Sequence, residues 1–99
     1  DIRQGSPTYC HWIGEELSFE NCKQLYIPEG FLHGFITLEP NTEIVYKCSD
    51  YYARECDGSI RFDDPEIAIE WPIDISNVIL SEKDAAAPLM QDFNNPFYF

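Results

Sequence analysis

Three short stretches of this sequence hold side chains that can bind a ligand or move a proton. The octet PEGFLHGF (28–35) combines a proline, two glycines and two phenylalanines with one titratable ring, that of His33. Segments of this composition shape binding pockets, although a lone histidine among apolar residues is also common as a satisfied core side chain. On the residues alone, both interpretations of His33 stay open.

The second stretch is TEIVYKCSD (42–50), whose alternation predicts a strand with Ile44, Tyr46 and Cys48 on one face. Tyr46 then points the same way as the apolar side chains. If that face lines the interior of a barrel, the phenol lies in a cavity and must find a polar partner. A core tyrosine with its hydroxyl at the rim fits the same pattern equally well.

The third stretch, SEKD (81–84), matches the capping-box pattern that begins helices. Ser81 is the expected N-cap, and Asp84 is expected to reach back to a free backbone amide. One helical turn through the following alanines should then end near Pro88. This interpretation accounts for Asp84 without any catalytic role.

The elements that position these side chains are predicted to be strands. Long amphipathic helical patterns are absent, and short runs rich in β-branched and aromatic residues recur between turn-forming segments, which is typical of an all-β protein. The final stretch QDFNNPFYF (91–99) is expected to pack over an opening or a neighbouring subunit, or to be a frayed end. The expected strands are residues 8–17, 23–27, 34–39, 42–50, 59–62 and 67–71.

Composition limits the classes of function. A chain of 99 residues with 44% hydrophobic content is expected to form one small domain. A net charge of −12 would repel nucleic acid and anionic membranes, so neither is an expected partner. Without an apolar span or a leader pattern, the cytoplasm is the default location. Four cysteines without a C-x-x-C pair favour free thiols over a zinc site or two disulfides.

Eight sequence blocks, in a fixed order along nearly the whole chain, resemble the dTDP-4-dehydrorhamnose 3,5-epimerase family. One block alone would be suggestive, whereas the ordered set is specific. The blocks are GSPT (5–8), WIG (12–14), LSFEN (17–21), QLYIPEGFLHGF (24–35), YKCSDYY (46–52), IRFDDP (60–65), IEWP (69–72) and LSEKDAAAPL (80–89).

The resemblance implies a cofactor-free, metal-free isomerase that epimerises a dTDP-4-keto-6-deoxy sugar at C3 and C5. It implies an all-β, cupin-like jelly roll, here partial and with a short C-terminal helical turn, in a homodimer that exchanges strands. Residues 1–99 correspond to the C-terminal half of the family's single domain. The other half would carry the histidine base and most of the cations that hold the pyrophosphate, so we expect this chain alone to be inactive.

The resemblance also assigns roles to individual residues. Tyr46 matches the catalytic acid, and Asp84 matches the carboxylate that orients the histidine base. His33 matches a substrate-contacting histidine, while Asp57 and Lys83 match further substrate-binding positions, with Asp57 in place of a more usual glutamate. Departures from the family pattern occur at Cys10, His11, Arg54 and Phe62.

Two other functions remain possible from the sequence. The chain could be a binding or structural module that dimerises and holds a dTDP-sugar without turning it over, which the absent base favours. A metal-dependent cupin is the weaker alternative, because two distant histidines do not make a facial ligand set.

Overall fold

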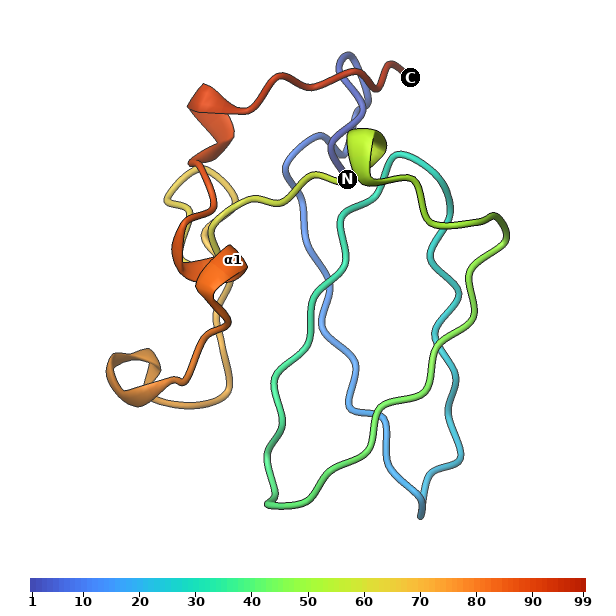
Figure 1. Ribbon diagram of the computed structural model, residues 1–99, viewed down its shortest axis with the longest axis vertical. Helices are drawn as coiled ribbons and strands as arrows, with labels where there is room; N and C mark the ends of the chain where they lie inside the picture. The colour runs from blue at the N-terminus through green and yellow to red at the C-terminus, as the bar shows by residue number, and fades with distance from the viewer.

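The computed structural model describes residues 1–99 and contains four short helical segments without any sheet (Figure 1). The one β pairing is an isolated parallel bridge between Gln4 and Tyr98. No helix is both long and apolar enough to cross a membrane. The helical segments are η1 (Arg54–Cys56), η2 (Ile75–Asn77), α1 (Glu82–Ala85) and η3 (Met90–Asp92).

The expectation of an all-β jelly roll is therefore wrong for this structure. Figure 1 shows the chain between the N-terminal loop and η1 as long, uncoiled limbs. From residue 23 to residue 52, only the carbonyl of Gly30 takes part in a backbone–backbone hydrogen bond. A β-ladder needs a second strand at hydrogen-bonding distance. The alternation of residues predicts which way side chains point, but it does not supply the partner strand.

Exposed apolar side chains follow from these unpaired limbs. Ile44 is 41% exposed and Tyr46 is 70% exposed, although the alternation in residues 42–50 places both on the apolar face of the expected strand. The buried apolar residues are Ile2, Ala87 and Met90. The molecule therefore buries its side chains near the N-terminal loop and the C-terminal third of the chain, and not between the limbs.

The buried carboxylate of Asp64 holds the C-terminal third together. Its Oδ1 accepts hydrogen bonds from the backbone amides of Glu66 and Ile67, at 2.9 and 3.0 Å. Its Oδ2 accepts a third from the amide of Met90 at 2.8 Å, which ties the start of η3 to the 64–67 turn. Buried carboxylates require such partners.

The expected helical turn near the C-terminus is present as α1. The side chain of Ser81 accepts a hydrogen bond from the amide of Asp84, as an N-cap does. The helix ends at Ala85, and Ala86 is its C-cap. The helix thus includes only the first of the three alanines that follow Asp84, and not all three as expected.

The last residues of the chain lie against its first residues. The amide of Gln4 donates to the carbonyl of Phe97 at 2.9 Å, and the amide of Phe99 donates to the carbonyl of Gln4 at 3.1 Å. Figure 1 shows both ends at the same end of the molecule. Of the alternatives for residues 91–99, the frayed end is excluded for the segment that pairs with Gln4.

Candidate active site

His33 and Tyr46 meet through their rings. The octet turns at Gly30, whose φ of +82° is a left-handed conformation that suits glycine. Three residues later, the ring of His33 lies edge-on to the ring of Tyr46, with centroids 6.4 Å apart and planes at 61°. Tyr46 is 70% exposed, so its phenol faces open space beside the histidine. This arrangement offers one titratable ring and one phenolic proton donor on the same surface.

Asp57 and Lys83 form an ion pair that joins η1 to α1. Asp57 is the C-cap of η1, and its Oδ2 lies 2.6 Å from Nζ of Lys83 in α1. The hydroxyl of Tyr52 donates a second hydrogen bond to the same oxygen at 3.2 Å. The hydrogen bond between Lys83 and Asp57 stabilises the charged form of each group. It therefore lowers the pKa of Asp57 and raises the pKa of Lys83. Both groups therefore stay charged over a wide pH range.

Asp84 is held by the residue that caps its helix. The hydroxyl of Ser81 donates a hydrogen bond to Oδ2 of Asp84 at 2.7 Å, while the amide of Asp84 donates to the same hydroxyl at 3.1 Å. The capping-box prediction had Asp84 accept from a backbone amide, whereas it accepts from the serine side chain. Its second oxygen, Oδ1, has no partner in the protein and is free to accept a hydrogen bond.

The five candidate residues thus fall into two groups. His33 and Tyr46 form one, and Asp57, Lys83 and Asp84 lie on or against α1 in the other. No hydrogen bond, ion pair or ring contact joins the two groups. Two open hollows are lined by other residues. The hollow of about 320 Å³ is lined by Ile13, Glu15, Leu17, Lys23, Gln24 and Leu25, and that of about 270 Å³ by Cys48, Ser49, Asp50 and Tyr51.

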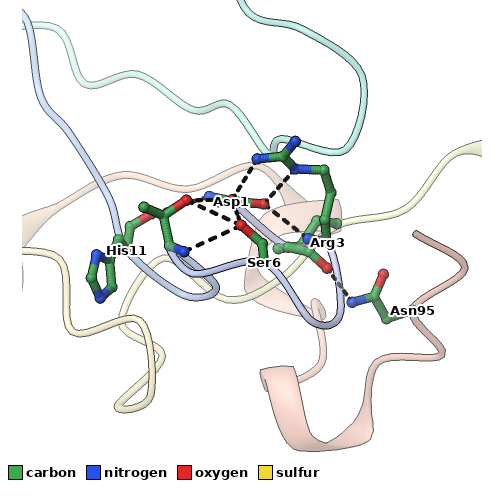
Figure 2. A network of polar contacts seen from close by, with 7 residues as sticks. Asp1, Arg3, Ser6, His11 and Asn95 are labelled. Atoms are coloured by element: carbon green, nitrogen blue, oxygen red, sulfur yellow. Dashed lines mark hydrogen bonds and ion pairs between the residues drawn. The ribbon is translucent and has the colours of Figure 1, made fainter. Parts of the chain in front are cut away.

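The sequence did not single out the polar network at the N-terminal loop, which Figure 2 shows. The carboxylate of Asp1 accepts from the guanidinium of Arg3 and from the hydroxyls of Ser6 and Thr8. The block GSPT is part of the family pattern, but the sequence alone assigns no role to its two hydroxyls. The clustering of Asp1 and Arg3 with these hydroxyls was the available signal.

Comparison with known proteins identifies the family. The family model described as dTDP-4-dehydrorhamnose 3,5-epimerase matches residues 1–92. A relative with that name from Salmonella typhimurium is 52% identical over 90 residues, which cover 91% of this chain and 49% of the relative. The relative of that name from Pseudomonas aeruginosa is 45% identical over 92 residues, covering 93% of this chain and 50% of its own length.

A more distant source gives the same result. The dTDP-4-dehydrorhamnose 3,5-epimerase from Methanothermobacter thermautotrophicus is 42% identical over 99 residues, covering 99% of this chain and 52% of the relative. This chain spans about half the length of the curated relatives that it matches. The chain belongs to the dTDP-4-dehydrorhamnose 3,5-epimerase family.

Proposed function

We propose that this chain supplies the proton donor and the base-orienting carboxylate of a sugar-nucleotide 3,5-epimerase. The substrate class is a dTDP-4-keto-6-deoxy sugar. Family membership and the edge-on contact between His33 and Tyr46 support the proposal, and that contact is the observation that carries it. It puts a proton donor beside a group that can bind a sugar or phosphate oxygen.

The chemistry requires few groups. A ketone at C4 of a hexose acidifies the hydrogens on C3 and C5, because the carbanion left by deprotonation delocalises onto the carbonyl oxygen as an enolate. Inverting each centre needs a base on one face of the ring and a proton donor on the other. A tyrosine, with an ordinary pKa of about 10, keeps its proton at neutral pH until the enolate accepts it.

The residues of this chain divide that work. Tyr46 would return a proton to the enolate, and His33 would hold the substrate beside it. The free oxygen of Asp84 would accept a hydrogen bond from an imidazole, fix its tautomer and favour the imidazolium form, which is the role of the carboxylate in other His–Asp pairs. Lys83, positioned by its ion pair with Asp57, would face an anionic part of the nucleotide. The imidazole base would come from a histidine outside these 99 residues.

Isotope exchange tests the proposal directly. We would join this chain to the preceding half of the Salmonella typhimurium relative, incubate the chimera with dTDP-4-keto-6-deoxyglucose in D2O, and follow C3 and C5 by proton NMR. Deuterium should enter at both carbons, whereas the 99-residue chain alone should give none. A folded chimera that binds dTDP but exchanges neither position would contradict the proposal.

A second candidate function is a binding module without turnover. The observation that favours it is the absence of any contact between the His33–Tyr46 pair and the group around α1. Calorimetric titration of the 99-residue chain with dTDP discriminates between the two functions. Affinity in the chain, together with no exchange in the chimera, would support binding alone.

We also propose that the protein forms a homodimer, as the resemblance to the family implies. The exposed apolar side chains of the limbs, such as Ile13, Phe19 and Val45, support this, because association of two chains would remove apolar surface from water. Sedimentation equilibrium should give twice the chain mass of 11.5 kDa at micromolar concentration. A single species at the chain mass would contradict the dimer.

A further inference from the structure

The guanidinium group of Arg3 lies between two aromatic rings from distant parts of the chain. Its Cζ is 4.7 Å from the centroid of the Phe31 ring and 5.0 Å from the centroid of the Phe99 ring. A guanidinium over an aromatic face is attracted by the negative potential of that face. Arg3 therefore links the octet that contains His33 to the last residue of the chain.

Asp1 fixes the plane of this guanidinium. Nε of Arg3 donates to Oδ1 of Asp1 at 2.9 Å, and Nη2 donates to Oδ2 at 2.8 Å, a bidentate pair (Figure 2). The Asp1 side chain is 1% exposed, and it also accepts from Ser6 at 2.6 Å and Thr8 at 2.7 Å. A carboxylate with this many donors has little freedom to rotate. The Asp1 carboxylate thus fixes the orientation of the Arg3 guanidinium between the two rings.

The backbone of the octet is fitted to the same arginine. The amide of Ile2 donates to the carbonyl of Gly30 at 3.0 Å. Gly30 is buried, and a Cβ at this position would lie 2.5 Å from Cγ of Arg3. The turn therefore packs directly on the alkyl part of Arg3, while the next residue, Phe31, packs on its guanidinium.

The second ring is held in place by the C-terminal segment. The amide of Phe99 donates to the carbonyl of Gln4, and the side-chain amide of Asn95 donates to the carbonyl of Ile2. The side chain of Gln4 donates in return to the carbonyl of Asn95 at 2.9 Å. Residues 95–99 are thereby tied to the residues on both sides of Arg3, which keeps Phe99 against it.

We infer that Arg3 is a positioning residue for substrate binding: held between Phe31 and Phe99, it fixes the octet so that His33 lies against Tyr46. Gly30 and Phe31 both pack on Arg3, and His33 follows within three residues, so a change at Arg3 is expected to shift the backbone that carries His33. Arg3 itself touches neither His33 nor Tyr46. The role of His33 in binding rests on the proposed function, whereas the geometric link between Arg3 and the His33–Tyr46 contact does not.

The test separates the stacking from the charge. Lysine at position 3 keeps the positive charge but lacks the planar group that stacks on two rings. In the isotopically labelled 99-residue chain, the His33 and Tyr46 rings should give an NOE cross-peak. We expect Arg3→Lys to abolish this cross-peak, whereas Arg54→Lys, at an exposed arginine in η1, should leave it unchanged. A folded Arg3→Lys chain that keeps the cross-peak would overturn the inference.

A second pair of variants applies if Arg3→Lys does not fold. Phe99→Leu removes one of the two rings and keeps an apolar side chain. Tyr98→Leu changes the neighbouring exposed aromatic residue, which makes no cation–π contact with Arg3. The cross-peak should be lost in Phe99→Leu and kept in Tyr98→Leu. Retention in both variants would overturn the inference.

Kinetics of the chimera then test the consequence for binding. Because His33 would bind substrate and Tyr46 would donate the proton, Arg3→Lys should raise KM roughly tenfold with little change in kcat, as the loss of one hydrogen bond to the substrate would. An unchanged KM would overturn the role in binding. If the cross-peak is lost in Arg3→Lys while the unmodified chimera has no activity, the proposed function fails and the positioning by Arg3 stands.

Discussion

Nζ of Lys83 lies 2.6 Å from Oδ2 of Asp57, and this ion pair joins the only α-helix to the C-cap residue of η1. The two residues are 26 positions apart in the chain. The hydroxyl of Tyr52 donates a hydrogen bond to the same carboxylate oxygen. The pair therefore orders the cation of Lys83, which would otherwise rotate freely on its four-carbon stem.

The pKa of Asp57 should report this pairing. Because the folded pKa of Asp57 is lowered, the pairing stabilises the fold above the ordinary pKa of about 3.9, and this contribution is lost as the pH falls below it. Because the pKa of Lys83 is raised, the contribution persists up to about pH 10.4 and is lost as the pH rises further. Carbon-13 NMR titration of the side-chain carboxyl should show that Lys83→Met raises the pKa of Asp57 towards 3.9.

The matched control for this titration is Lys47→Met, because Lys47 is exposed and forms no ion pair. It should leave the pKa of Asp57 where it is in the unmodified chain. An equal pKa of Asp57 in the Lys83→Met and Lys47→Met variants would show that the ion pair does not form in solution.

Tyr46→Phe should slow the chimera without weakening substrate binding. The change removes only the phenolic oxygen, and general acid catalysis contributes about 10²- to 10⁴-fold, so kcat should fall at least about a hundredfold. KM should change little, because the ring beside His33 remains. Turnover and KM are measured by coupled assay, with deuterium exchange at C3 and C5 in parallel.

Tyr26→Phe is the control for Tyr46→Phe. Tyr26 is 87% exposed and lies outside both groups of candidate residues, so removal of its hydroxyl should leave kcat unchanged. Equal turnover of Tyr46→Phe and Tyr26→Phe would remove Tyr46 from the mechanism and leave the binding module as the better description.

Local features were predictable from the sequence. Ser81 and Asp84 form their cap within one helical turn, so the four residues SEKD contain all the information needed. The bend at Gly30 follows in the same way from a residue that adopts positive φ without strain. The predicted partner of the Asp84 carboxylate was wrong, because the hydroxyl of Ser81 competes with its amide for the same oxygen.

Non-local features were not predictable in this way. Alternation in TEIVYKCSD indicates two faces but does not specify a partner strand, and the segment has no backbone partner in the structure. The stacking of Arg3 on Phe31 and Phe99 depends on the approach of three separate segments. Resemblance to the family named Asp57 and Lys83 as binding residues, but their mutual ion pair became visible only in the structure.

Ser81→Ala should weaken α1 and release Asp84 together. Loss of an N-cap serine costs about 1 kcal/mol, and here the same hydroxyl also holds the Asp84 carboxylate. Urea denaturation should show that loss in the free energy of unfolding. Ser49→Ala, at an exposed serine outside any helix, should leave the free energy of unfolding unchanged. Equal midpoints for the two variants would mean that the cap contributes nothing in solution.

Asp64→Asn should destabilise the C-terminal third of the chain more than any surface aspartate change. Asp64 is only 3% exposed, and the two oxygens of its carboxylate accept hydrogen bonds from three backbone amides. Asparagine has one acceptor oxygen, so its NH2 group would face at least one amide that needs an acceptor. An unsatisfied buried donor costs about 1–3 kcal/mol, which urea denaturation should detect.

Asp92→Asn provides the comparison, since Asp92 is exposed in η3 and accepts no hydrogen bond. It should leave the unfolding midpoint unchanged. Hydrogen exchange adds a local measurement, because the amides of Glu66, Ile67 and Met90 should exchange faster in Asp64→Asn while the amide of Ala85 in α1 keeps its rate. Uniformly faster exchange would indicate global destabilisation, and unchanged exchange at Met90 would show that Asp64 does not tie η3 to the 64–67 turn.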